Sequence, residues 1–64
     1  MTLTARQEQV ISLIARGLTD KEIASELSIS ISTVEYHVGV ILRSLDAKSR
    51  ANAVAIRFVP DFEK

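Results

Sequence analysis

The 64-residue chain contains no cysteine and a single histidine. Disulfide bonds and a structural zinc site, which stabilise many domains of this size, are therefore excluded. A chain this short buries only about 60% of the surface of its unfolded state, so its core is thin. We expect one small domain over residues 1–64, stabilised either by unusually close helix packing or by association.

Long hydrophobic runs are also missing. The longest apolar run, Val38 to Leu42, is far too short to cross a membrane and includes Gly39. The N-terminus shows no charged segment followed by an apolar one, which argues against secretion. We expect a soluble, cytoplasmic protein with no membrane partner.

Catalytic and cofactor motifs are absent as well. No Ser, Cys or acidic residue is placed by a motif to pair with His37, and no glycine-rich segment is suited to hold a phosphate group. A lone histidine without Cys or carboxylate spacing is not a metal site. The sequence therefore indicates a protein that is not an enzyme and that uses no cofactor, metal or small-molecule ligand.

The formal net charge is zero, but the charges are unevenly distributed. Residues 1–35 contain three basic and five acidic residues, a net charge of −2. Residues 36–59 contain four basic residues and one acidic residue, a net charge of +3. A surface for a polyanion is therefore expected in the C-terminal half.

Helix-capping patterns divide the chain into helices, and no alternating strand pattern is present. Thr4 with Gln7 and Thr19 with Glu22 form capping boxes, and Gly17 is placed to end the first helix. Apolar residues then recur at helical spacing. The predicted fold class is all-α, with four helices.

The third and fourth helices also begin at hydroxyl residues. Ser30 can cap the third helix, although Ser32 offers a rival start two residues later. Ser49 caps the last helix, at about 49–59, which ends before Pro60. The third helix has a buried stripe at helical spacing, formed by Val34, Val38, Ile41 and Leu45.

The second and third helices, at about 19–45, are joined by about three residues, as in a helix-turn-helix. Ala24 is the small residue at which the two helices approach closely, and Ile29 fills the turn. Many motifs of this type have glycine where this chain has Ser28. A serine is tolerable there if the backbone avoids strongly positive φ.

Four segments follow one another with regular spacing: "LTARQEQVI", "GLTDKEIA", "LSISISTVEYH" and "ILRSLDAKSRANAV". Over residues 3–55, about four-fifths of the chain, the sequence resembles the LuxR-type (GerE-like) DNA-binding domain. The resemblance implies a four-helix transcriptional regulator that binds double-stranded DNA with its third helix in the major groove. Its fourth helix is then expected to form a homodimer on an inverted repeat, with RNA polymerase as a candidate partner and the nucleoid as its location.

Four residues of the third helix lie opposite the buried stripe and form what we call the open face: Glu35, Tyr36, Gly39 and Arg43. In the LuxR family the first three places face base edges, with lysine frequent at the first and third. Glu35 can accept a hydrogen bond from cytosine, and Tyr36 can reach a phosphate or a thymine methyl group. Gly39 contributes only close approach, and Arg43 is expected to strengthen binding to all sequences alike. We expect weak sequence readout.

Phosphate contacts are expected around this face. The N-terminus of the third helix, with Ser32 and Thr33, is suited to bind an anion. Arg50 can instead pair with a nearby acid as a clamp between helices, and His37 is expected to be partly buried and structural. Four cations could flank the major groove: Lys21, Arg43, Lys48 and Arg50. The alternative for each is an ordinary solvated surface residue.

The last helix carries more apolar residues than a small core requires. Ala53 and Val54 are expected to face the core, as the family's pattern suggests. The alternative to a dimer is that Phe58 and Phe62 fold back onto the core of a monomer. The predicted dimer face consists of the remaining apolar residues: Ala55, Ile56, Phe58, Val59 and Phe62.

Two other functions remain open. Region four of a sigma factor shares much of the motif, although the "YH" step and the helix after "AKSR" favour the LuxR type. A helix-turn-helix protein-interaction module without DNA binding fits the neutral charge, Glu35 and Gly39, whereas Thr33, Arg43 and Lys48 oppose it. No receiver or ligand-sensing domain is evident, so a stand-alone regulator and part of a longer protein both fit.

Overall fold

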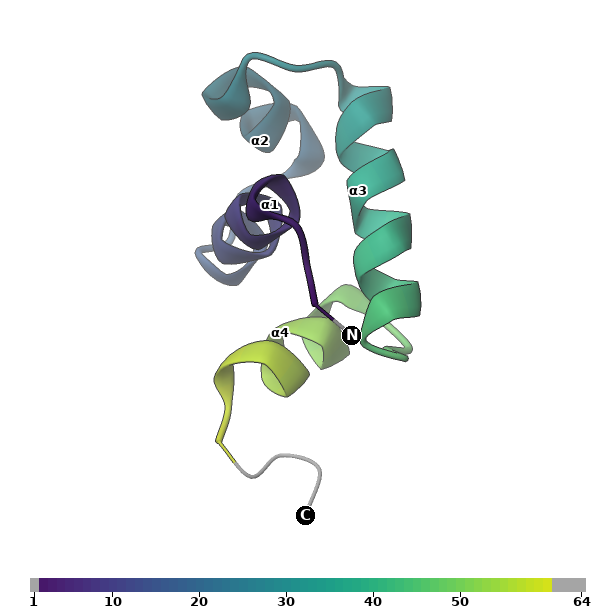
Figure 1. Cartoon of the computed structure of the whole chain (residues 1–64). Coiled ribbons are helices and arrows are strands. Elements are labelled where there is room, and N and C mark those ends of the chain that lie inside the picture. Colours follow the sequence, from purple (N-terminus) through teal and green to yellow (C-terminus); the bar gives the residue numbers. More distant parts are fainter. Residues whose placement is uncertain (1, 61–64) are drawn as a thin grey trace.

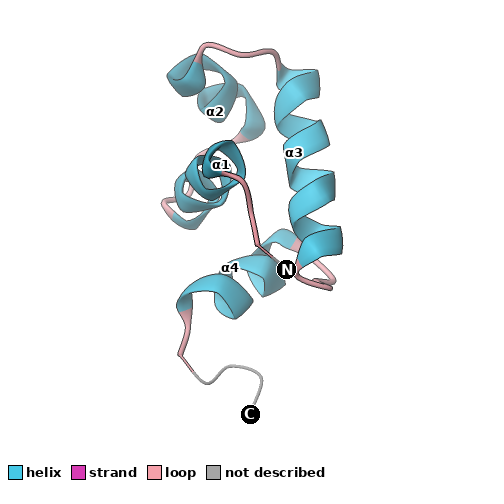
Figure 2. Ribbon diagram, viewed as in Figure 1, coloured by secondary structure: helices cyan, strands magenta, loops and turns pink. Residues whose placement is uncertain are grey.

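The computed structural model of the chain describes residues 2–60, and all regular structure within them is helical. The helices are α1 (Ala5–Ala15), α2 (Asp20–Leu27), α3 (Ile31–Ser44) and α4 (Arg50–Phe58) (Figures 1 and 2). The prediction of an all-α, four-helix fold is confirmed. Each described helix is too short or too polar to span a lipid bilayer.

The first two helices begin at the predicted capping boxes. In the first box the Thr4 hydroxyl accepts from the Gln7 backbone N–H, and the Gln7 side-chain oxygen accepts from the Thr4 N–H at 3.1 Å. Thr19 and Glu22 repeat the arrangement at the start of α2, with a carboxylate–amide distance of 2.8 Å. Each box satisfies two backbone donors that have no partner inside the helix.

The other two helices begin at single serine caps. The Ser30 hydroxyl accepts from the Thr33 N–H at 3.1 Å, and the Ser49 hydroxyl accepts from the Asn52 N–H at 3.0 Å. Ser30, rather than its rival Ser32, therefore begins α3.

The turn does not meet the condition stated for a tolerable serine at position 28, a backbone that avoids strongly positive φ. Ser28 lies in the left-handed region, with φ 57° and ψ 45°. Its N–H donates to the Ser25 carbonyl, and the Ile29 N–H donates to the Ala24 carbonyl at 3.0 Å. This pair of hydrogen bonds is the Schellman motif, which requires a left-handed residue and brings Ile29 back over Ala24. The same motif ends α1 at Gly17, as predicted, and ends α3 at Asp46.

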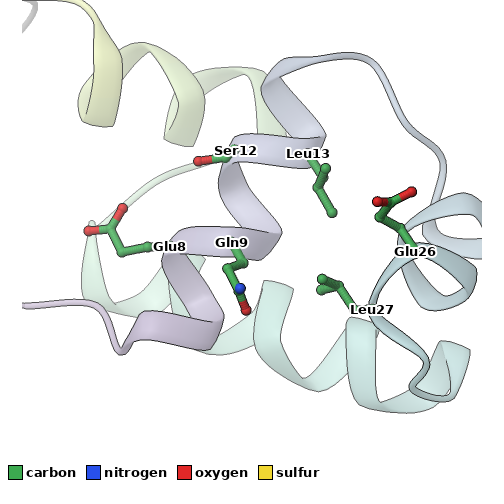
Figure 3. A pocket seen from close by; sticks show the side chains of 6 residues that line it. All are labelled: Glu8, Gln9, Ser12, Leu13, Glu26 and Leu27. Atoms are coloured by element: carbon green, nitrogen blue, oxygen red, sulfur yellow. The ribbon is translucent and has the colours of Figure 1, made fainter.

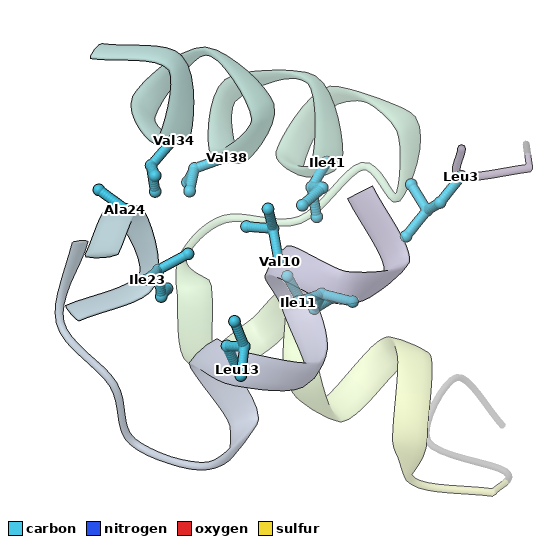
Figure 4. Close-up of a cluster of buried hydrophobic side chains, with 10 residues drawn as sticks. Leu3, Val10, Ile11, Leu13, Ile23, Ala24, Val34, Val38 and Ile41 are labelled. Carbon is cyan, nitrogen blue, oxygen red and sulfur yellow. The ribbon is translucent and has the colours of Figure 1, made fainter. Parts of the chain in front are cut away.

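The core is formed where α1, α2 and α3 meet, with α4 closing one end (Figures 1 and 4). The predicted inward residues of α3 are buried, while Leu45 is half-buried against the core. From α4 the core receives Ala53, with Val54 packed beside it, as predicted. The buried apolar side chains are Leu3, Val10, Ile11, Leu13, Ile23, Ala24, Val34, Val38, Ile41 and Ala53.

The helix-turn-helix consists of α2 and α3, joined across the short turn at one end of the molecule (Figure 1). Ala24 is 6% exposed and lies beside Val34 and Val38, where α2 approaches α3 (Figure 4). Helices α1 and α2 both pack on one side of α3. No described helix covers the opposite side of α3 (Figure 2).

Candidate nucleic-acid interface

The uncovered side of α3 carries the open face. Glu35, Tyr36 and Arg43 are exposed and Gly39 is half-exposed. Tyr36 and Arg43 each follow a fully buried residue, Val34 or Ile41, by two positions. Two positions turn a helix by about 200°, so these two side chains lie almost directly opposite the core. They form the centre of the open face.

Glu35 lies at the edge of the open face. The pKa of the Arg50 guanidinium is raised by its hydrogen bond to Asp20, and further by the charges of Asp20 and Glu35. The Glu35 carboxylate therefore lies near the ion pair that joins α2 to α4. Helical geometry agrees with this position, because Glu35 is turned about 100° from the buried Val34.

Arg50 forms the clamp that the sequence left as an alternative to a phosphate contact. Its two terminal nitrogens donate to both carboxylate oxygens of Asp20, with Nη2 2.8 Å from Oδ2. This hydrogen bonding holds the pKa of Asp20 below its ordinary value. A bidentate pair of this kind fixes the start of α4 against the start of α2.

The N-terminus of α3 holds a cluster of hydroxyl groups. The Ser30 hydroxyl lies 3.0 Å from that of Ser32 and 2.8 Å from that of Thr33. Ser30 uses the Thr33 N–H, whereas the N–H groups of Ile31 and Ser32 have no acceptor within α3, because they precede its first full turn. These donors and the positive end of the helix dipole favour an anion at this point.

One of the two predicted lysines lies at the start of the motif and the other just beyond its end in sequence. Lys21 is exposed in the first turn of α2. Lys48 is exposed in the connection between α3 and α4, where its backbone N–H donates to the Asn52 side chain at 2.9 Å. Neither lysine belongs to the ion pairs of the described residues, which are Arg50–Asp20 and Arg57–Glu8.

His37 is half-buried beside the core, as predicted. Its Nδ1 atom is buried and has no hydrogen-bond partner within residues 2–60. The imidazole ring meets the Tyr36 ring edge to face, with centroids 5.5 Å apart. His37 therefore supports Tyr36 from below the open face, an arrangement that limits the directions available to the tyrosine ring.

The apolar side of α4 is partly uncovered. Phe58 is 41% and Val59 49% exposed, while Ala55 and Ile56 are half-buried. Phe58 does not fold back onto the core, so that alternative is wrong for this residue. Phe62 lies outside the described residues.

The contact between Arg57 and Glu8 was not predicted. The Arg57 Nε lies 2.9 Å from a Glu8 carboxylate oxygen and joins α4 to α1. The Arg57 guanidinium carbon also lies 4.9 Å from the centre of the Phe58 ring. The two residues of the ion pair are 49 positions apart, so no local spacing signals it.

A groove between α1 and α2 was not predicted either (Figure 3). It has a volume of about 310 Å³ and is lined by Glu8, Gln9, Ser12, Leu13, Glu26 and Leu27. Two carboxylates line it and no cation does, so it is not suited to nucleic acid.

The chain is similar in sequence to several known proteins. Residues 1–57 match the family described as "Bacterial regulatory proteins, luxR family". The chain is 44% identical over 52 residues to the transcriptional regulatory protein DesR of Bacillus subtilis (strain 168), covering 81% of the chain and 26% of that protein. It is 46% identical over 52 residues to the transcriptional regulatory protein LiaR of the same strain, covering 81% and 25%.

A third relative is the response regulator protein VraR of Staphylococcus aureus (strain NCTC 8325 / PS 47). The identity is 43% over 56 residues, covering 88% of the chain and 27% of VraR. The chain thus spans about a quarter of the length of the curated relatives that it matches.

Proposed function

Because the chain belongs to the luxR family of bacterial regulatory proteins, we propose that it binds double-stranded DNA through α3 and thereby regulates transcription. The observation that carries this proposal is the uncovered side of α3, where Tyr36 and Arg43 lie opposite the core. The family match favours this function over a sigma-factor region, the rival with a similar motif.

The dimensions of α3 suit the major groove. Its 14 residues span about 21 Å, and the groove of B-DNA, about 12 Å wide, admits one helix. With the open face toward the base edges, the free N–H groups at the start of α3 point to the phosphate backbone. Lys21, at the start of the motif, and Lys48, just beyond its end, then supply phosphate contacts.

We further propose that two protomers bind together through α4, on DNA of the nucleoid. Phe58 and Val59 present an exposed apolar surface, and the small Ala55 allows the partner helix to approach. A two-fold dimer places two α3 helices about one DNA turn apart. The binding site is therefore an inverted repeat with half-site centres about 10 bp apart.

Selection from a pool of random duplexes tests the DNA-binding proposal. We expect enrichment of an inverted repeat with that spacing. Enrichment of a direct repeat would contradict the two-fold arrangement, and no enrichment above the unselected pool would contradict sequence-selective binding.

Analytical ultracentrifugation tests the role of α4. Phe58→Glu should leave the protein monomeric at concentrations where the wild type dimerises, because it introduces two charges into the apolar contact. Gln9→Glu is the matched control, since it adds the same charge at an exposed position of α1. A wild type that stays monomeric at high concentration and binds DNA one to one would rule out the dimer.

A further inference from the structure

The fold does not require a glycine at position 39. Gly39 lies inside α3 with no positive φ, and a Cβ added there would meet only the Nη1 atom of Arg43, at 4.0 Å. That separation is an ordinary van der Waals contact. Glycine inside a helix is less stable than alanine because it loses more backbone freedom on folding. The folded chain therefore gives no reason for a glycine here, and the residue leaves an open space on the surface of α3.

Arg43 occupies the space that Gly39 leaves. Helical side chains lean toward the N-terminus of the helix, so a residue covers the position four places before it. The 4.0 Å approach shows that the Arg43 guanidinium lies over Gly39. Tyr36, three places before Gly39, lies on the other side of the same gap. Arg43 takes part in neither of the ion pairs of the described residues, so its donors are free for a ligand.

We propose that Arg43 reads a guanine, taking over the base-contacting place that Gly39 leaves empty. This inference rests on the proposed function, since it requires α3 to lie in the major groove. The planar guanidinium donates two parallel hydrogen bonds, which match the O6 and N7 acceptors of guanine. A side chain longer than alanine at position 39 would displace the guanidinium from the helix and hold α3 farther from the base edges.

The position of Arg43 favours a base over a phosphate as its ligand. Arg43 lies on the midline of the open face, almost directly opposite Ile41 in the core, one residue before the end of α3. Residues in that direction point to the floor of a groove that holds the helix. The phosphates lie along the two edges, beside Lys21, Lys48 and the start of α3. The role proposed for Arg43 thus differs from the phosphate contact, common to all DNA sequences, that its charge alone suggests.

The test uses the best duplex obtained by selection and the same duplex with each guanine replaced in turn by 7-deazaguanine, which lacks the N7 acceptor. The wild type should lose about tenfold in affinity at one guanine of each half-site. Arg43→Ala removes both donors, so it should respond less than twofold to the same replacement. Arg6→Ala, at an exposed arginine on α1, is the matched control and should respond as the wild type does.

Two substitutions at Gly39 test the vacant space. Gly39→Ala should keep the guanine response, because its Cβ meets Arg43 at ordinary contact distance. Gly39→Gln should abolish it, because the longer uncharged side chain occupies the space of the guanidinium. Circular dichroism melting checks that each variant is folded.

An Arg43→Ala variant that responds to 7-deazaguanine as the wild type does would overturn the proposal. So would an Arg43→Ala variant that weakens selected and random duplexes by the same factor, since that result assigns Arg43 to a phosphate. A folded wild type that binds no duplex refutes the proposed function and this inference together. That outcome is recognised before any variant is compared.

Discussion

Replacing Ser28 with glycine should stabilise the domain. Ser28 is exposed and is held at φ 57° by the Schellman motif that ends α2. A side chain in this left-handed conformation places its Cβ too close to the following carbonyl oxygen, at a cost of about 1–2 kcal/mol. Glycine has no Cβ, so Ser28→Gly removes the strain and leaves both hydrogen bonds of the turn in place.

The gain is smaller than the strain, because glycine also stabilises the unfolded chain. The additional backbone freedom of glycine in the unfolded chain cancels roughly 0.5–1 kcal/mol of the strain that the substitution removes. We expect a net increase of about 0.5–1 kcal/mol in the free energy of unfolding. For a domain of this size, that corresponds to a rise in Tm of roughly 2–8 °C.

Thermal and urea denaturation followed by circular dichroism measure this change. The matched control is Ser25→Gly, the same substitution at an exposed position inside the same helix. There the backbone is right-handed, and glycine should destabilise the protein by about 0.5 kcal/mol. If Ser28→Gly and Ser25→Gly changed the free energy of unfolding in the same direction and by the same amount, the left-handed turn would be refuted. The geometry that joins α2 to α3 would be refuted with it.

Three further substitutions test the helix packing, the clamp and the open face. Ala24→Leu should lower the free energy of unfolding by about 1–3 kcal/mol through overpacking, and an unchanged Tm would mean that α2 does not cross α3 at this residue. Asp20→Asn should cost only about 0.5–1 kcal/mol at pH 7, since the Arg50 side chain is 43% exposed. The folded-state pKa of Asp20 is lowered, so this stabilisation is complete above the ordinary carboxyl pKa and disappears as the pH falls through the lowered value. Urea denaturation of wild type and variant at pH 7 and at pH 2 measures this change. A difference in the free energy of unfolding that is the same at both pH values contradicts it. Glu35→Ala should raise affinity for random duplexes and relax one base preference, and an unchanged preference in a selection experiment would remove Glu35 from direct readout.

Local patterns explain why the helices could be predicted. Each helix start depends on a hydroxyl and a backbone N–H three residues later, as at Thr4 and Ser49. The buried stripe of α3 depends only on helical periodicity. Such features involve neighbouring residues, and their geometry follows from residue type and spacing alone.

The features that could not be predicted depend on tertiary structure. The sequence suggested a clamp for Arg50 but not its partner, because Asp20 lies 30 positions away and only the packing of α2 and α4 around α1 and α3 brings the two residues together. The same packing brings the charge of Glu35 near Arg50, a proximity that no local spacing signals. At Ser28 the packing of Ile29 over Ala24 outweighs the preference of a serine for negative φ. On α3, by contrast, helical spacing from the predicted buried stripe already places Tyr36 and Arg43 opposite the core and Glu35 at the edge of the open face.

The salt dependence of binding to a random duplex tests most directly whether α3 and its flanking lysines form a DNA-binding surface. Fluorescence anisotropy gives the association constant over a range of NaCl concentrations. If Lys21 and Lys48 of each protomer in a dimer neutralise one phosphate apiece, the logarithm of the constant should fall linearly with the logarithm of salt, with a slope of about −4. A variant with both lysines replaced by glutamine should show a nearly flat dependence. A folded wild type whose binding is absent, or unchanged by salt, would contradict the account and favour a protein-interaction module.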